Sequence, residues 1–167
     1  MGLDNGITLW MKKPVNERIA SLLTDVEWEH DPYDENLQGF DLLYWRKCWN
    51  VRYAIAEVLN ENRDKGVKFT YDTNCDGIPV DCYSATFGVD VLERILDKLR
   101  EDVYSYEAWG DSIWDWHDPE QDDEEGTKRD MGVCDSYWYH LTHAYQVLEI
   151  LRTLDPGSYE IEFYDSY

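Results

Sequence analysis

Residues Ile7–Lys12 read Ile-Thr-Leu-Trp-Met-Lys, so that apolar side chains occupy every second position on one side. This period of two is typical of a strand that buries one face, here the face of Ile7, Leu9 and Met11. Near the other end of the sequence, Tyr159–Tyr164 alternates in the same way. Because each stretch is too short to be stable alone, we predict that the two strands pair in antiparallel orientation.

Three segments between these strands carry apolar residues at helical spacing. Steps of three and four residues predict a long helix over Phe40–Asn62 and a second from near Gly88 to Val103. A third stripe predicts a helix over about Asp135–Leu154, which Asp155-Pro156-Gly157 would end because proline removes a backbone donor.

The remaining segments complete the predicted fold. Val15–Leu23 is typical of a short helix, and Glu27–Gly39 of a polar loop. Val67–Tyr71 and Val80–Thr86 flank Asp76-Gly77, which favours a hairpin with a positive φ in its turn. The sequence therefore predicts one α+β domain, with three main helices packed on a small, largely antiparallel sheet.

Composition limits the function classes. The chain has 167 residues, and 15 basic against 36 acidic side chains give a net charge of −21, which disfavours direct binding to nucleic acid. The chain is 43% hydrophobic and 15% aromatic, which is more apolar surface than disordered chains have, so the composition favours a folded protein. The four cysteines lack paired spacing, which is typical of a reducing compartment, and no apolar run approaches the ~20 residues that span a membrane. We therefore expect a cytoplasmic protein. We also expect no cofactor.

Acidic charge is concentrated in an insert over residues 109–132, between the second and third predicted helices. Loops of this length are usually functional or disordered, although a charged run can also be a solvated surface that aids solubility. Its carboxylates could imitate phosphates, and its tryptophans could anchor a partner. The candidate partner-binding residues are Asp111, Trp114, Asp115, Trp116, Asp118, Glu120, Asp122, Asp123, Glu124 and Glu125.

A second candidate site is the one locally basic aromatic segment. Tyr44, Trp45, Arg46 and Trp49 would share the start of the long predicted helix. Stacking on tryptophan and an arginine clamp could hold a small anion or a nucleotide there. The same residues could equally belong to the core and to ion pairs on the helix surface.

Metal sites are weaker candidates. The stretch 72–77 matches the first half of a calcium loop, with Asp72, Asn74 and Asp76 as ligands. Tyr83 stands where such a loop needs a bidentate glutamate, so a simple hairpin turn is the competing interpretation. His140 and His143 have a spacing that zinc accepts, but such a pair is also common as a hydrogen-bonded surface feature.

Three short motifs resemble a family of uncharacterised phage proteins, which begin Met-Gly-Leu-Asp-Met-Tyr-Leu and carry a Tyr-Trp-Arg-Lys motif. Here they are Met1-Gly2-Leu3-Asp4, Tyr44-Trp45-Arg46-Lys47 and Asp81-Cys82-Tyr83. The sequence departs at Asn5-Gly6 and at the acidic insert, which replaces a segment rich in Gly and Phe. The resemblance implies a phage or prophage origin and a bacterial host cell, but no activity.

From these features we expect a non-enzymatic, phage-encoded inhibitor. It would bind a basic, nucleic-acid-processing defence protein of the host, such as a CRISPR effector or a restriction enzyme, by presenting carboxylates as a nucleic-acid mimic. The alternative is a small-ligand binder, such as a sponge for nucleotide immune signals. A metal-dependent enzyme is the third hypothesis.

Overall fold

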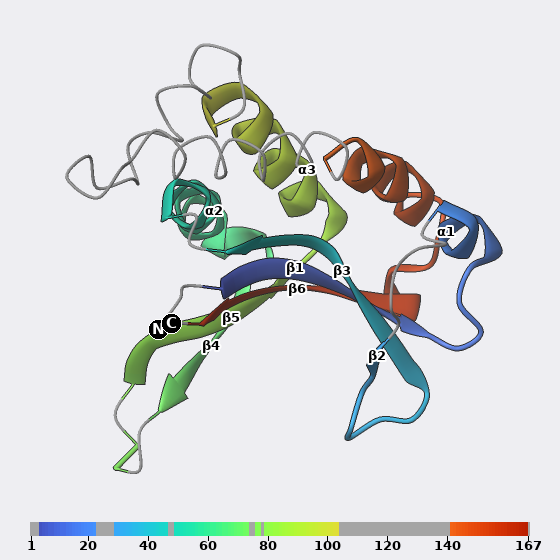
Figure 1. Cartoon of the computed structure of the whole chain (residues 1–167), viewed down its shortest axis with the longest axis horizontal. Coiled ribbons are helices and arrows are strands. Elements are labelled where there is room, and N and C mark those ends of the chain that lie inside the picture. Colours follow the sequence, from blue (N-terminus) through green and yellow to red (C-terminus); the bar gives the residue numbers. More distant parts are fainter. Residues whose placement is uncertain are drawn as a thin grey trace, which may run out of the picture.

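The computed structural model describes residues 4–22, 29–46, 49–73, 76–77, 79–103 and 141–166. Their core architecture is a six-stranded sheet in which each strand is antiparallel to its neighbours (Figure 1). The spatial order is β2-β3-β1-β6-β5-β4. The strands are β1 (Asp4–Lys12), β2 (Glu29–His30), β3 (Leu37–Arg46), β4 (Lys68–Thr73), β5 (Pro79–Phe87) and β6 (Tyr159–Ser166).

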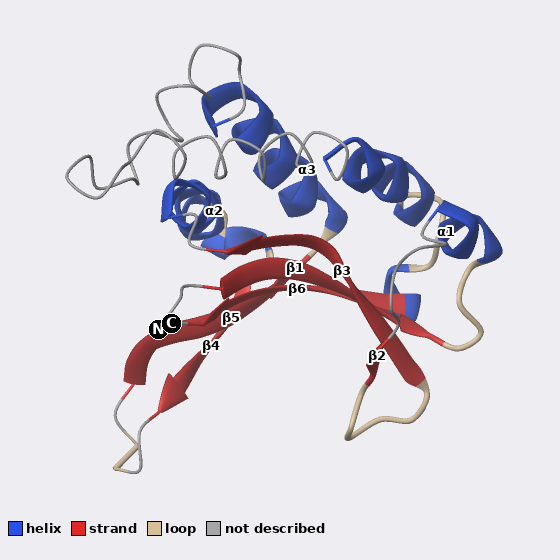
Figure 2. Ribbon diagram, in the orientation of Figure 1, coloured by secondary structure: helices blue, strands red, loops and turns tan. Residues whose placement is uncertain are grey.

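Figure 2 shows the helices gathered on one face of this sheet, which confirms the predicted α+β class. They are α1 (Glu17–Leu22), α2 (Trp49–Glu61), α3 (Val89–Lys98) and an unlabelled helix over 141–151, coloured orange in Figure 1. A π-helical turn, η2 (Leu99–Val103), extends α3, and short 3₁₀ turns form η1 (Arg63–Lys65) and η3 (Pro156–Ser158). None of the helices in the described ranges has the length and apolar character needed to cross a membrane.

The predicted pairing of the first and last strands is confirmed. In the register of β1 and β6, Ile7 lies opposite Phe163 and Leu9 lies opposite Ile161. All four side chains are fully buried. The alternation therefore places one apolar row of each strand under the helices, and the polar rows on the other face.

The predicted helix over Phe40–Asn62 is wrong in its first part. Residues up to Arg46 belong to β3, which pairs along the whole of β1, and the helix α2 begins only at Trp49. A bulge opposite Ile7 and Thr8 makes Leu42 and Leu43 both buried. This extra residue breaks the period of two, so the apolar pattern runs on into that of α2 and resembles one long helix.

The same strand shortens the predicted polar loop. Glu27–Gly39 was expected to be irregular, but β2 lies within it and β3 begins at Leu37. Asp31 accepts hydrogen bonds from the backbone N–H groups of Tyr33 and Asp34 at 2.7 and 3.1 Å. These bonds close a tight turn between two strands where polar composition alone favoured a loop.

The hairpin and the second helix are confirmed. β4 and β5 flank Gly77, whose φ is +77°. Gly88 precedes the first turn of α3, and Leu92, Ile95 and Leu96 face inward. The described part of the third helix ends at residue 151, three residues before the predicted end, and residues 135–140 of the prediction lie outside the described residues.

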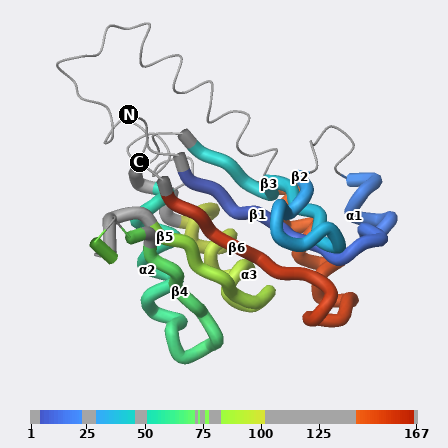
Figure 3. Tube along the Cα trace, turned by 90° about the horizontal axis from the view of Figure 1, so that it is seen from below, coloured from blue at the N-terminus to red at the C-terminus, as the bar shows by residue number. Residues whose placement is uncertain are grey.

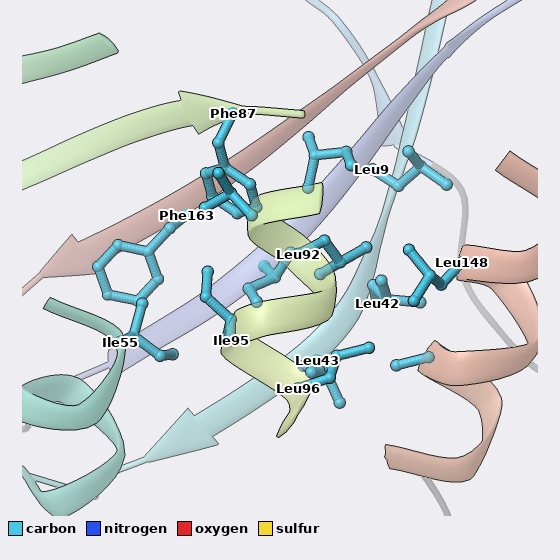
Figure 4. Packing of buried hydrophobic residues seen from close by; sticks show 14 of the residues in the cluster. Leu9, Leu42, Leu43, Ile55, Phe87, Leu92, Ile95, Leu96, Leu148 and Phe163 are labelled. Atoms are coloured by element: carbon cyan, nitrogen blue, oxygen red, sulfur yellow. The ribbon is translucent and has the colours of Figure 1, made fainter. Parts of the chain in front are cut away.

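Figure 4 shows the core between the sheet and the helices, where Leu42 and Phe163 meet α3 and Leu148. Fully burying an aliphatic or aromatic side chain of this size contributes roughly 1.5–3 kcal/mol to folding. An ion pair between Lys98 and Glu57, 3.2 Å apart, joins α3 to α2 at the surface of this layer.

Candidate functional site

On the face of the sheet opposite the helices, aromatic and acidic side chains of three neighbouring strands lie together. Figure 3 views the molecule from this side, with no described helix in front of the central strands. Alternation turns Thr8 and Trp10 of β1 to this face, together with Glu162 and Tyr164 of β6. Asp41 of β3 joins them because it pairs with Thr8.

Trp10 packs on a glycine of one neighbouring strand and lies beside a carboxylate of the other. Its register partner on β3 is Gly39, and a Cβ atom built there would overlap the indole ring. The ring therefore lies directly against the backbone of β3, which only glycine permits at this position. The indole also lies close enough to Glu162 on β6 to lower the pKa of that carboxyl, against the larger effect of burial.

Tyr164 makes the mirrored arrangement. It lies opposite Gly6 of β1, where an added Cβ would stand 2.8 Å from the phenol oxygen and 2.6 Å from the carbonyl oxygen of Leu43. The ring thus crosses β1, and its hydroxyl lies close enough to Asp41 on β3 to lower the pKa of that carboxyl slightly. Thr8 donates a hydrogen bond to Asp41, at 3.2 Å. Each of the two carboxylates therefore lies beside an aromatic ring from a neighbouring strand, and Asp41 is also bound by Thr8.

The electrostatics of this region are acidic. Partial burial, then the charge of Glu29, raises the pKa of Asp41, although the hydroxyl groups of Thr8 and Tyr164 oppose the rise. Burial also raises the pKa of Glu162, with further contributions from its acidic neighbours. We call this surface the acidic face; its residues are Thr8, Trp10, Glu29, Asp31, Asp41, Glu160, Glu162 and Tyr164.

The chemistry available on the acidic face suits a cation. Carboxylates accept hydrogen bonds from guanidinium or ammonium groups, and the adjacent indole and phenol rings attract cations to their faces. Lys12 and Lys68 lie on the same side of the sheet, at the end of β1 and on the outer strand β4. In the described part of the chain, no group of three or more His, Cys, Asp or Glu residues is arranged to hold a metal ion.

A second polar arrangement lies under the helices, at the end of the apolar core. Asp165 is fully buried and accepts a hydrogen bond from Nε of Arg52 in α2 at 2.7 Å. Its register partners are Asn5 and Tyr83. Burial and the charge of Asp165 raise the pKa of Tyr83 to about 12. Within the described residues, neither polar side-chain atom of Asn5 has a hydrogen-bond partner.

The predicted aromatic and basic site is not assembled as expected. Tyr44, Trp45 and Arg46 lie on β3 and only Trp49 lies on a helix. Successive strand residues face opposite sides of the sheet, so Tyr44 is half exposed while Trp45 is buried at 2% exposure. Because this segment is a strand and not a helix, its aromatic rings do not share one face and do not form the predicted site.

The other sequence candidates lie largely outside the described residues. This holds for the whole acidic insert over 109–132 and for its ten named residues. Asn74 also falls outside them, Asp72 lies on β4, and Asp76 is exposed in the turn before β5. The hairpin is thus present, while the insert stays a prediction.

Part of the acidic face could have been found from sequence. Pairing the first and last strands already places Thr8 and Trp10 beside Glu160 and Glu162. Asp41 could not have been placed on this face from sequence, because the apolar spacing of its segment predicts a helix. The glycines opposite the two rings are the signal that sequence reasoning missed.

Comparison with known proteins adds no relative: no family model matches the chain, and no curated protein or solved structure shows a significant match.

Proposed function

We propose that the protein is a non-enzymatic inhibitor that binds a basic partner protein through the acidic face. The observation that carries the proposal is the pair of carboxylates, Asp41 and Glu162, that flank Thr8 and each lie beside an aromatic ring. A preorganised pair loses little conformational entropy on binding a cationic side chain.

The charges of the acidic face support this proposal. Its five carboxylates belong to Glu29, Asp31, Asp41, Glu160 and Glu162. Among the described residues, no basic side chain forms an ion pair with any of them. They are therefore available to a partner, and the net charge of −21 would accelerate its approach.

The rings of Trp10 and Tyr164 supply the apolar part of such an interface. Both are partly exposed on the open face and packed closely against a glycine of a neighbouring strand. Tryptophan, tyrosine and arginine dominate the binding energy of protein interfaces, so rings beside carboxylates favour an arginine-rich partner surface. Trp114 and Trp116 of the insert would add further anchors beside its carboxylates.

The partner class follows from this chemistry and from the phage setting that the sequence motifs imply. Proteins that process nucleic acids expose basic channels for phosphates. Carboxylates displayed on an open sheet face can occupy such a channel. We therefore propose a host defence protein of this kind, such as a CRISPR effector or a restriction enzyme, in the bacterial cytoplasm.

Capture from a bacterial host lysate with matched variants tests the proposal. Asp41→Asn/Glu162→Gln removes two charges from the acidic face, while Glu61→Gln/Asp64→Asn removes two exposed charges from α2 and η1. We expect the wild type and the α2/η1 variant to retain a basic nucleic-acid-processing protein at about 0.1 M salt and to release it at about 0.5 M.

The acidic-face variant should retain at least tenfold less of this partner protein than the wild type does. Equal capture by both double variants would show that binding depends on overall charge and would overturn the site. Capture that survives high salt in all three proteins would overturn the electrostatic mechanism. A nuclease assay with the purified captured protein then tests inhibition directly.

A further inference from the structure

A separate cavity of about 770 Å³ opens at the corner where η1, the start of α3 and the start of β6 meet. Lys65, Lys68 and Arg94 contribute basic side chains to its wall, and Phe87 and Tyr159 contribute aromatic ones. Its volume lies within the roughly 300–1,000 Å³ of small-molecule sites. Mixed charged and aromatic walls suit a ligand that has both an anionic group and a ring.

The three basic residues come from three different elements, which makes their convergence a property of the fold. Lys65 belongs to η1, Lys68 to β4 and Arg94 to α3. In the described part of the chain none of them forms an ion pair, although acidic residues outnumber basic ones in the sequence by 36 to 15. Arg94 is fixed by a hydrogen bond from its guanidinium to Oδ1 of Asn62, 2.7 Å away.

Three carboxylates also line the cavity, and two of them share one arginine as their ion-pair partner. Arg152 binds Asp90 at 3.0 Å and Glu93 at 2.5 Å from outside. Glu160 remains as the third. Because one guanidinium offsets only one negative charge, the three lysine and arginine side chains of the wall face a net of two negative charges, which leaves a small positive excess in a protein whose net charge has the opposite sign.

The walls leave room for a ring beside the charges. Added Cβ atoms at Gly66 and Gly88, which both line the cavity, would meet no atom within 4 Å. Phe87 and Tyr159 form apolar surface from β5 and β6. A base or another flat ring can pack on such surface while lysine and arginine bind its phosphate.

We propose that this cavity binds a small phosphate-bearing molecule of nucleotide size. Lys65 and Lys68 contact the phosphate as mobile point charges, and Arg94 contacts it from a fixed position. The ring packs toward Phe87 and Tyr159. This site shares Glu160 with the acidic face, and Lys68 lies on the same side of the sheet, but its cations and rings gather around η1 and the start of α3. It places a nucleotide-binding activity elsewhere than at the Tyr44 segment.

Isothermal titration with adenosine monophosphate and with adenosine tests the proposal on the full chain. We expect the monophosphate to bind at one site and adenosine to bind at least tenfold more weakly, a difference of about 1.4 kcal/mol. No measurable binding of the monophosphate at millimolar concentration would overturn the proposal. Equal affinity for the two probes would also overturn it, because the phosphate would then contribute nothing.

A pair of charge-matched variants locates the site. Lys65→Gln/Lys68→Gln removes two cations from the cavity, and Lys98→Gln/Arg100→Gln removes two from the opposite end of α3. We expect the first variant to weaken binding of adenosine monophosphate at least tenfold and the second to change it less than twofold. An equal effect of the two variants would mean that the ligand responds to net charge and not to this cavity.

Discussion

At the scale of single residues, two glycines define the acidic face. Gly39 and Gly6 lie under the rings of Trp10 and Tyr164. The ring of Trp10 extends toward Glu162, two strands from Gly39, and the ring of Tyr164 extends toward Asp41, on the strand next to Gly6. A side chain at either glycine would lift the ring and move it away from its carboxylate. These glycines therefore control both packing and the position of the acidic groups.

The substitution Gly39→Ala should destabilise the protein by about 1–3 kcal/mol, the usual cost of forcing extra atoms into a packed position. The added methyl group would overlap the indole ring of Trp10. Gly157→Ala is the control, because its Cβ would meet only Asp155, at 3.6 Å or more. Denaturant unfolding of both variants is the measurement, and equal stabilities would contradict the packing described for Trp10.

Arg52 compensates a buried charge. Its substitution to Leu leaves Asp165 fully buried without the cation that binds it at 2.7 Å, and breaking such a pair costs about 3–5 kcal/mol. Burial already raises the pKa of Asp165, and removal of Arg52 raises it further. The folded state then binds a proton that the unfolded state has lost, so stability falls as pH rises.

We therefore expect the deficit of Arg52→Leu to be larger at pH 8 than at pH 5, measured by denaturant unfolding at both values. Arg18→Leu, at an exposed position on α1, should change stability by less than about 0.5 kcal/mol at either pH. A deficit that does not depend on pH would show that Arg52 acts through packing alone.

At the scale of elements, alternation was a reliable guide where strands are regular. It located the first and last strands, the hairpin and the inward face of α3. It failed at β3, because the bulge places Leu42 and Leu43 on the same buried side. No local signal marks such a bulge; it depends on the register with β1, which is a contact between segments far apart in sequence.

The candidate sites divide in the same way. Thr8, Trp10, Glu160 and Glu162 could be brought together from sequence, since they lie on strands whose pairing was predicted. The cavity could not, because Lys65, Lys68 and Arg94 meet only through the packing of three elements. The predicted site at Tyr44 is wrong, because successive residues of a strand face opposite sides of the sheet, whereas a helix would have placed some of them on one face.

At the scale of the whole molecule, negative charge opposes folding. The net charge is −21, and the pKa values of Asp41, Glu162 and Asp165 are all raised, in each case chiefly by burial. A raised carboxyl pKa means that the folded state binds protons at a higher pH than the unfolded chain does. Stability therefore increases as pH falls from neutrality toward the ordinary carboxyl pKa of about 4.

We expect the Tm to rise when the pH is lowered from 7 to 5, and to rise again at pH 7 when salt is increased from about 0.05 to 0.5 M, because screening reduces self-repulsion. Differential scanning calorimetry is the measurement. The variant Glu162→Gln should show a smaller response to pH than the wild type. A Tm that decreases on mild acidification would show that paired, not repelled, carboxylates dominate the stability.

The sheet order has a consequence for synthesis of the chain on the ribosome. β1 emerges early and β6 emerges last among the described strands, yet β6 lies between β1 and β5. Until its eight residues are made, the nascent chain holds two partial sheets with facing, unpaired edges. Such edges can pair with other chains, so the final strand both completes the fold and ends its exposure to misassembly during translation.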